Sequence, residues 1–222
     1  MKIEVQNLLK DYVQGEQTVK ALDNVNFSIS SGELICVTGR SGSGKSTLLN
    51  IIAGLTIPTS GSIIADGKNI FTLSDIELSL YRNAKIGCIP QQQSALSNLT
   101  VLDNVRLPFH LSKREGDSTE EAYRLLELVG IEKLAQRVPK RLSGGQLKRV
   151  VIARAMMNNP KLLLADEPTG DLDTETTTDI MEIFRRVSQS GTAILMVTHD
   201  LDTTGYVDKH FTMSNGILSA SS

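Results

Sequence analysis

The glycine-rich stretch GRSGSGKST at 39–47 restricts the possible folds most, because it lies between an apolar strand-like segment, LICVT, and an apolar helix-like segment, LLNIIAGL. At such a strand-to-helix turn, backbone N–H groups surround a phosphate chain and the positive end of the helix dipole faces it. Lys45 would reach the terminal phosphates, and the Ser46 hydroxyl would ligate Mg²⁺. Flexible linkers lack such apolar flanks. The expected phosphate-binding residues are Gly39, Arg40, Ser41, Gly42, Ser43, Gly44, Lys45, Ser46 and Thr47.

Short β-rich runs along the chain predict the sheet that carries this loop. The runs alternate with helical patterns, and several are apolar throughout, which is typical of strands buried on both faces of a mainly parallel sheet. We therefore predict an α/β fold. The strands are expected at 3–5, 25–29, 34–37, 62–65, 86–89, 162–165 and 193–197.

The middle of the chain differs, because helical signals predominate from 74 to about 157. The segment STEEAYRLLELVG places apolar residues along one stripe, and Gly130 can end that helix. Ser118 and Glu121 resemble a capping box at its start. No internal repeat or long linker is evident. We predict one domain over 1–222, with a helical subdomain inserted at approximately 92–158.

Bulk composition argues against several functions. The 23 Lys and Arg residues nearly balance 25 Asp and Glu residues, so no overall basic field attracts nucleic acid or an anionic membrane. The longest apolar runs fall short of the roughly 18 residues that a membrane span needs, and the first residues do not form a signal-peptide core. We expect a soluble cytoplasmic chain. Cys36 and Cys88 lie in apolar runs without metal-ligand spacing and are expected to be buried.

Two adjacent carboxylates end a second apolar strand, in the segment KLLLADEP at 161–168. Adjacent strand residues point to opposite faces, so Asp166 and Glu167 are expected to have different roles. Asp166 suits the outer sphere of Mg²⁺, whereas Glu167 can face the terminal phosphate and act as the general base on the attacking water. Beside a phosphate loop, we favour these roles over a solvated turn.

A third buried strand ends in the segment MVTHD, which contains His199. A lone histidine in such a place is more often a structural residue than a catalytic one. Ligands of open α/β sheets bind at the carboxyl ends of the strands, however. This position makes His199 a candidate sensor of the terminal phosphate.

The segment LSGGQ at 142–146 completes a specific combination of motifs. It precedes LLLADEP, and the segments DLD and THD follow in order. Together with the phosphate loop, these motifs resemble the nucleotide-binding subunits of ABC transporters, almost from Lys2 to Gly216. The resemblance implies ATP hydrolysis, with ATP and Mg²⁺ as cofactors. It also implies a P-loop NTPase core with an N-terminal antiparallel β portion and the inserted helical subdomain.

The resemblance assigns roles to further residues. Tyr12 matches the aromatic residue that stacks on adenine. Gln91 matches the glutamine that touches both Mg²⁺ and the membrane partner. Leu172 and Asp173 match the loop that crosses the dimer interface, and His199 matches the switch histidine.

The resemblance also implies a head-to-tail homodimer, in which each ATP lies between the phosphate loop of one copy and the LSGGQ segment of the other. Donors at the start of the LSGGQ helix would bind the terminal phosphate across the interface. The residues concerned are Ser143, Gly144, Gly145 and Gln146.

A separate integral membrane permease is the other partner that the resemblance implies. We therefore expect a peripheral subunit at the cytoplasmic face of the inner membrane, with no nucleic acid partner. The docking surface is expected around Gln91 to Arg106, a segment that contains Ser94 and Asn98.

Within the family, LSNLTVLDNV and DEPTGDLD look most like the group that releases lipoproteins, exports macrolides or confers resistance to antimicrobial peptides. Two positions depart from that group. Pro90 stands before Gln91 where an aromatic residue is usual, and it stiffens the loop. Asp171 stands where asparagine is usual. Its negative charge would weaken dimer closure around a polyphosphate unless a cation answers it.

Two other functions are alternatives. The first is a soluble ABC ATPase that acts on ribosomes or DNA, although such proteins usually carry two ATPase units or long coiled-coil insertions. The second is a P-loop kinase for a small molecule, against which LSGGQ and the adjacent carboxylates argue. The transported substrate is not encoded here, because ABC ATPase subunits hold no transport pocket.

Overall fold

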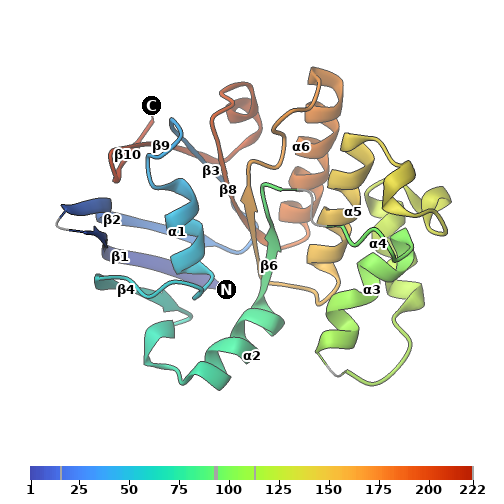
Figure 1. The fold of residues 1–222 in the computed structure, drawn as a ribbon, viewed down its shortest axis with the longest axis horizontal. Helices are drawn as coiled ribbons and strands as arrows, with labels where there is room; N and C mark the ends of the chain where they lie inside the picture. Colours follow the sequence, from blue (N-terminus) through green and yellow to red (C-terminus); the bar gives the residue numbers. More distant parts are fainter. Residues whose placement is uncertain (16, 93–94, 113, 222) are drawn as a thin grey trace.

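A six-stranded sheet forms the centre of the computed structural model, which describes residues 1–15, 17–92, 95–112 and 114–221 (Figure 1). Its strand order is β10–β9–β3–β8–β7–β6. The pairs are parallel except that β10 runs antiparallel to β9. The strands are β3 (Leu34–Thr38), β6 (Ile86–Ile89), β7 (Leu162–Asp166), β8 (Ala193–Thr198), β9 (Lys209–Ser214) and β10 (Ile217–Ala220).

A second, antiparallel sheet of four strands contains the N-terminal hairpin, in the order β2–β1–β4–β5. Its strands are β1 (Lys2–Gln14), β2 (Gln17–Ser30), β4 (Ser60–Ala65) and β5 (Lys68–Asn69). The runs predicted at 3–5 and 25–29 are only the buried ends of β1 and β2. The outer half of the hairpin, where Tyr12 pairs with Val19, is exposed and has no apolar alternation that sequence reasoning could detect.

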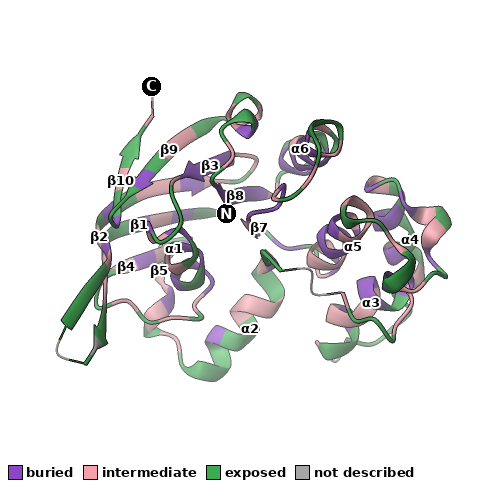
Figure 2. Ribbon diagram, turned by 45° about the horizontal axis from the view of Figure 1, so that its top comes forward, coloured by how far each residue is buried: buried purple, intermediate pink, exposed green. Residues whose placement is uncertain are grey.

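The predicted burial of the parallel sheet on both faces is confirmed, since every residue of β3 and β8 is buried (Figure 2). Alternate residues belong to two different cores: Cys36 packs with the helical side, and Ile35 packs with the side that faces the antiparallel sheet. Helix α1 (Lys45–Ile52) covers the second side. Helix α6 (Thr174–Gln189) covers the first.

Three helices, α3 (Val101–Leu111), α4 (Thr119–Leu128) and α5 (Gly144–Met156), pack together at the α6 end of the molecule (Figure 2). Arg149 of α5 donates to the carbonyl of Val129 at 2.7 Å and pairs with Asp179 of α6, so it joins this group to the core. Helix α2 (Asp75–Lys85) leads into β6. The short 3-10 helices are Ile70–Thr72, Glu132–Leu134, Pro139–Arg141 and Asp202–Tyr206.

The capping box predicted at Ser118 and Glu121 is wrong. The Ser118 side chain makes no capping bond to α4, and its hydroxyl instead accepts from Arg106 Nε at 2.9 Å. Glu121 pairs with Arg124 on its own helix. Arg106 of α3 therefore uses the Ser118 hydroxyl as its acceptor, whereas the local sequence pattern predicted that this hydroxyl would cap α4.

The two cysteines differ in exposure. Cys36 is fully buried, and this burial raises the pKa of its thiol to about 12. Cys88 is exposed, which contradicts the expectation. Its neighbours Gly87 and Ile89 on the edge strand β6 are buried, so Cys88 points to the opposite face, which is less covered at this end of the sheet. Within the described ranges, no helix is both long enough and apolar enough to span a bilayer.

Candidate nucleotide site

The phosphate loop lies between β3 and α1, as predicted. Gly44 caps α1 with φ of 109°, and Gly42 has φ of 78°, both in the region that favours glycine. The ammonium of Lys45 lies inside the loop, because Nζ donates to the carbonyls of Gly39 at 2.6 Å and Arg40 at 3.1 Å. The loop is therefore already wound around a cation that can accompany a phosphate chain.

The C-terminal hairpin supports the phosphate loop from behind. A Cβ atom on Gly39 would lie 2.3 Å from the carbonyl oxygen of Met213 in β9. Gly216, in the turn between β9 and β10, donates to the carbonyl of Ser43 at 3.0 Å and accepts from the amide of Asp23 at 2.9 Å. The loop is thus held by segments far away in the sequence.

A cavity of 620 Å³ opens in front of the phosphate loop. One wall comes from the N-terminal hairpin, where the half-exposed ring of Tyr12 lies beside Val19 and Lys10 Nζ is 5.0 Å from the ring centroid. Twelve of the predicted residues line this cavity: Tyr12, Arg40, Ser41, Gly42, Gly44, Lys45, Ser46, Thr47, Gln91, Asp166, Glu167 and His199. The structure thereby brings together positions from β1, the phosphate loop, and the ends of β6, β7 and β8.

Asp166 and Glu167 both line this cavity, although strand alternation predicted opposite directions. The strand β7 ends at Asp166, and Glu167 adopts a positive φ of 47° outside it. Alternation therefore does not apply to this pair. Burial raises the pKa of Asp166, while a hydrogen bond with the Ser46 hydroxyl opposes the shift.

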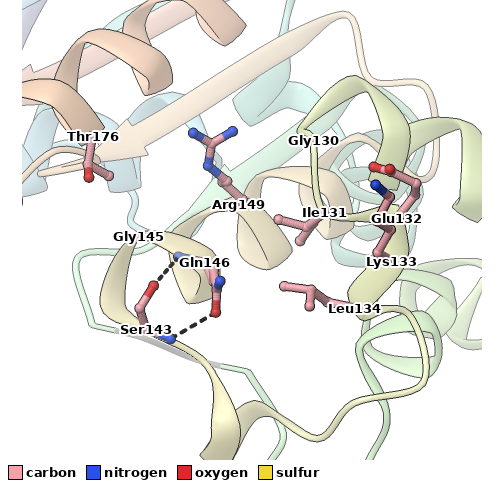
Figure 3. Close-up of a pocket in the computed structure, with 10 residues that line it drawn as sticks. All are labelled: Gly130, Ile131, Glu132, Lys133, Leu134, Ser143, Gly145, Gln146, Arg149 and Thr176. Atoms are coloured by element: carbon pink, nitrogen blue, oxygen red, sulfur yellow. Dashed lines mark hydrogen bonds between the residues drawn. The ribbon is translucent and has the colours of Figure 1, made fainter.

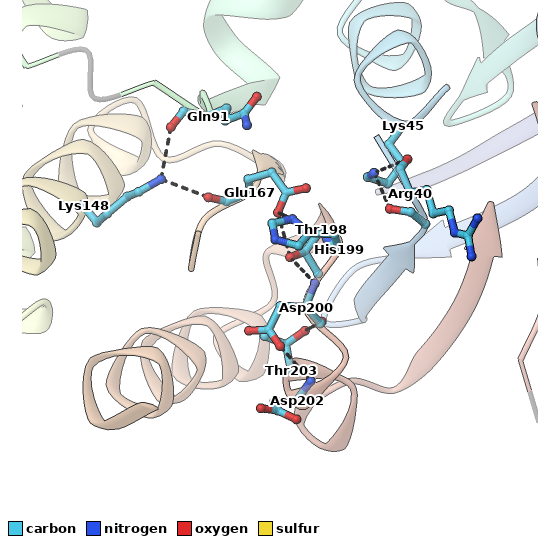
Figure 4. Close-up of polar contacts among 11 residues, drawn as sticks. Arg40, Lys45, Gln91, Lys148, Glu167, Thr198, His199, Asp200, Asp202 and Thr203 are labelled. Atoms are coloured by element: carbon cyan, nitrogen blue, oxygen red, sulfur yellow. Dashed lines mark hydrogen bonds and ion pairs between the residues drawn. The ribbon is translucent and has the colours of Figure 1, made fainter. Parts of the chain in front are cut away.

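The carboxylate of Glu167 is held through one oxygen, Oε2 (Figure 4). Oε2 accepts from the Thr198 hydroxyl at 2.9 Å and from the His199 amide at 3.3 Å, and it lies 3.0 Å from His199 Nδ1. In the described residues, Oε1 has no protein donor. The carboxylate is therefore fixed in direction, with one oxygen available to a water molecule.

Oxygen ligands for Mg²⁺ meet at the same place. Ser46, Asp166 and Gln91 line the same cavity, and Ser46 lies close enough to Asp166 to oppose the rise that burial causes in the pKa of its carboxyl. Hydroxyl and carboxylate oxygens, completed by phosphate oxygens, suit this cation. The described part of the chain contains no group of three His, Cys, Asp or Glu side chains that would hold a metal by itself. These residues fit a cation that arrives with a nucleotide.

The LSGGQ segment lies at a different cavity, of 510 Å³, which shares no lining residue with the first (Figure 3). Ser143 caps α5, because its hydroxyl accepts from the Gln146 amide at 3.3 Å and its amide donates to Gln146 Oε1 at 3.0 Å. Gly145 also lines this cavity, whereas Gly144 lines a third one beside Glu167. The chain does not fold its own LSGGQ segment onto its own phosphate loop.

Asp173 has a capping role that sequence reasoning missed. Its carboxylate accepts from the amide and the hydroxyl of Thr176, both at 2.8 Å, at the start of α6. These bonds hold the pKa of Asp173 below its ordinary value. The sequence did carry a signal, since aspartate is among the residues preferred immediately before the first turn of a helix.

Lys148 was also missed. Its side chain is buried, and Nζ donates to the carbonyls of Glu167 at 2.9 Å and Gln91 at 3.2 Å (Figure 4). In the sequence it reads as one of several cations that flank LSGGQ. The available signal was its spacing, because a residue four positions after Gly144 lies on the same helix face as that glycine.

A comparison with protein families decides the identity of the fold and its motifs. The ABC transporter family model matches residues 22–170. The chain belongs to the ABC transporter family. It is similar to the macrolide export ATP-binding/permease protein MacB of Chlorobaculum tepidum, with 42% identity over 97% of this chain and 33% of that protein. It thus spans about a third of that relative.

Two other proteins match this ABC cassette along almost their whole length. The lipoprotein-releasing system ATP-binding protein LolD of Shewanella frigidimarina is 41% identical over 97% of this chain and 91% of that protein. A dimeric structure of the bacterial ABC transporter cassette MJ0796 has a TM-score of 0.89, with 38% identity over 98% of both chains. A second structure of that cassette is a post-hydrolysis state with ADP and phosphate. The present chain has the ABC ATPase fold and is a nucleotide-binding ATPase.

Proposed function

We propose that two copies of this cassette bind two Mg²⁺–ATP molecules between them and use the hydrolysis to drive a separate membrane permease. The observation that carries this proposal is the separation of the phosphate loop from the LSGGQ segment within one chain. A head-to-tail dimer joins each cavity to the missing half of the site. The dimeric structures of the similar cassette MJ0796 support this arrangement.

The phosphate-loop side of each site would bind both ends of the nucleotide, the adenine and the terminal phosphates. Tyr12 would stack on the adenine, and Lys45 would pair with the terminal phosphates. Ser46, Asp166 and Gln91 would hold the Mg²⁺ ion, which would offset phosphate charge when bound. The remaining phosphate-loop residues would supply backbone amides to the phosphate chain.

The water-activating step would belong to Glu167. Its fixed carboxylate has Oε1 free to accept a proton from water while Oε2 stays with Thr198 and His199. His199 would contact the terminal phosphate from the end of β8, since its side chain is largely exposed to the cavity. Loss of that phosphate would then remove a contact of His199, the residue that orients the Glu167 carboxylate.

The LSGGQ side would bind the terminal phosphate of the partner's nucleotide. The Ser143 hydroxyl accepts one capping bond and keeps its own proton to donate. The amides of Gly144 and Gly145 lie at the positive end of the 13-residue helix α5. Gln146 would support them through the capping box, and Leu172 and Asp173 would lie along the interface.

We assign the permease contact to the inserted helical subdomain at about 92–158, and in particular to 91–106. Gln91 connects the nucleotide cavity to this segment, so a change at the phosphate can reach the membrane partner. The names of MacB and LolD support export of a substrate or release of a lipoprotein as the coupled work. We place the subunit at the cytoplasmic face of the inner membrane.

Copurification tests this function. We expect the Glu167→Gln chain, tagged and loaded with ATP, to bring down a polytopic membrane protein from detergent-solubilised membranes of its own organism. Release of that protein should follow removal of nucleotide from the wild-type complex. Recovery of ribosomes or DNA, or of no partner in any nucleotide state, would contradict the proposal.

Crosslinking tests the docking surface. Asn98 is exposed within the segment, whereas Ser94, the other position expected there, lies outside the described residues. A single cysteine at Asn98, in a chain with Cys36→Ala and Cys88→Ser, should crosslink to a cytoplasmic segment of the permease. A cysteine at exposed Ser219 on β10 is the matched control and should not. Crosslinks from Ser219 alone would reject this placement.

A further inference from the structure

Lys148 connects elements that belong to different nucleotide sites of the proposed dimer. It lies on α5, the helix that begins at the LSGGQ segment, and its side chain is 5% exposed. Its Nζ donates to the carbonyls of Gln91 and Glu167, which follow β6 and β7 (Figure 4). Through Lys148, helix α5 is therefore hydrogen-bonded to the two segments that carry the chain's own proposed Mg²⁺ ligand, Gln91, and general base, Glu167.

The bond to Glu167 has a specific structural use. Glu167 has φ of 47°, a conformation that a residue with a side chain keeps only when its surroundings hold it. Its amide donates to the carbonyl of Val197 at 2.9 Å, and its carbonyl accepts from Lys148 Nζ at 2.9 Å and from the amide of Gly170 at 3.3 Å. Loss of the lysine removes the shorter of the two hydrogen bonds to this carbonyl and leaves only the bond from Gly170.

The positive charge of Lys148 also compensates the negative charge of Asp171. Both residues line a cavity of 430 Å³ that also contains Glu167 and Gln91. Burial lowers the pKa of Lys148, and the carboxylates of Asp171, Glu167 and Asp166 oppose the shift, with Asp171 the strongest. The two charges share this cavity, and the effect of Asp171 on the pKa of Lys148 is coulombic, with no hydrogen bond between the pair involved.

We propose that Lys148 is a positioning residue that holds Glu167 and Gln91 in their catalytic arrangement and balances the charge of Asp171. This inference rests on the proposed function, because it takes Glu167 as the base of the ATPase. A second consequence follows from the helix. Gly144 and Lys148 lie one turn apart on α5, and a helical turn moves as a unit. A partner nucleotide that displaces Gly144 would therefore also displace Lys148 and its hydrogen bond to Glu167.

Lys148→Gln tests the positioning role. We expect kcat for ATP hydrolysis to fall on the order of tenfold to hundredfold, while KM for ATP changes by less than about threefold, because the phosphate loop and Tyr12 are not touched. Lys161→Gln, at an exposed lysine before β7, is the matched control and should keep wild-type kinetics. A wild-type kcat in Lys148→Gln, or a loss confined to KM, would overturn the proposal.

Asp171 provides the second test. In Lys148→Gln the Asp171 charge is left without its cation, so adding Asp171→Asn should restore the part of the lost kcat that this charge causes, while the part caused by the lost hydrogen bonds to Glu167 and Gln91 remains. Asparagine tolerates the left-handed backbone of this position, where φ is 63°. Asp171→Asn alone should have a small effect. Independent effects of the two substitutions, which would multiply in the double variant, would contradict the charge balance.

A mixed dimer separates failure of this inference from failure of the proposed function. One subunit carries Lys45→Ala and the other Gly145→Asp, so one site survives, and it uses the Glu167 of the Gly145→Asp subunit. Lys148→Gln should slow single-turnover hydrolysis when placed in the Gly145→Asp subunit and not in the other. A dimer that binds no ATP contradicts the shared site. A dimer that binds ATP and hydrolyses it equally in both placements contradicts only the role of Lys148.

Discussion

A mixed dimer of one Lys45→Ala subunit and one Gly145→Asp subunit is expected to trap about one ATP when both subunits also carry Glu167→Gln to prevent turnover. In a head-to-tail dimer, the intact phosphate loop of the Gly145→Asp subunit meets the intact LSGGQ segment of the other, and one complete site survives. If each chain closed on itself, no site would be complete. Retained nucleotide is counted after purification through two different tags.

The reciprocal dimer is the sharpest control. It places Lys45→Ala and Gly145→Asp in the same subunit and neither in the other, so the total set of substitutions is unchanged. Sites shared between chains then contain one damaged half each, and no ATP should be trapped. Sites closed within one chain would instead leave one intact. Trapping in the reciprocal dimer alone, or in neither folded dimer, would count against the shared site.

A steric control is also needed, because a Cβ atom at Gly145 would lie 2.6 Å from Cγ2 of Thr176. Gly145→Ala introduces this contact without the negative charge. If the charge excludes a phosphate, the alanine variant should trap more nucleotide than the aspartate variant. Equal loss in both would show that the contact with Thr176 displaces the start of α5.

Glu167→Gln alone is expected to lower ATP turnover on the order of 10² to 10⁴-fold and to leave ATP affinity nearly unchanged. Glutamine keeps the shape of the side chain and can still accept from Thr198, but it takes no proton from water. The substitution should not change the backbone strain at position 167, because glutamine and glutamate are similarly disfavoured at its positive φ of 47°. Phosphate release and nucleotide affinity should be measured on the same preparations.

Glu182→Gln is the matched control for this change, because Glu182 is exposed on α6 and does not line the cavity. It should keep wild-type turnover. A Glu167→Gln cassette with near-normal turnover would remove Glu167 from the role of base. A cassette that no longer binds ATP would instead point to a structural role for the carboxylate at the end of β7.

The phosphate loop and the buried strands were predictable because their signals are local. The order of apolar strand, glycine-rich loop and apolar helix specifies its own geometry, and the structure has α1 starting at Lys45 as that order requires. The resemblance of the motifs to a known family then supplied the roles of residues such as Tyr12 and Gln91, which no local pattern distinguishes from ordinary surface residues.

What was not predictable depends on contacts between distant segments. The Ser118 hydroxyl accepts a hydrogen bond from Arg106 of another helix, and Cys88 points to the less covered face of the edge strand β6. The position of Lys148 depends on how α5 packs against the ends of β6 and β7. In each case the sequence pattern is compatible with the outcome, but only the tertiary arrangement selects it.

The support of the phosphate loop by the C-terminal hairpin bears on the order of events during synthesis. The loop and β3 leave the ribosome early, but the strands that flank β3 are β8 and β9, and the residues behind the loop are Met213 and Gly216. A nascent chain that ends before these residues therefore has the glycine-rich motif without the scaffold that shapes it. We therefore expect the phosphate loop to reach its binding conformation only after translation has passed Gly216.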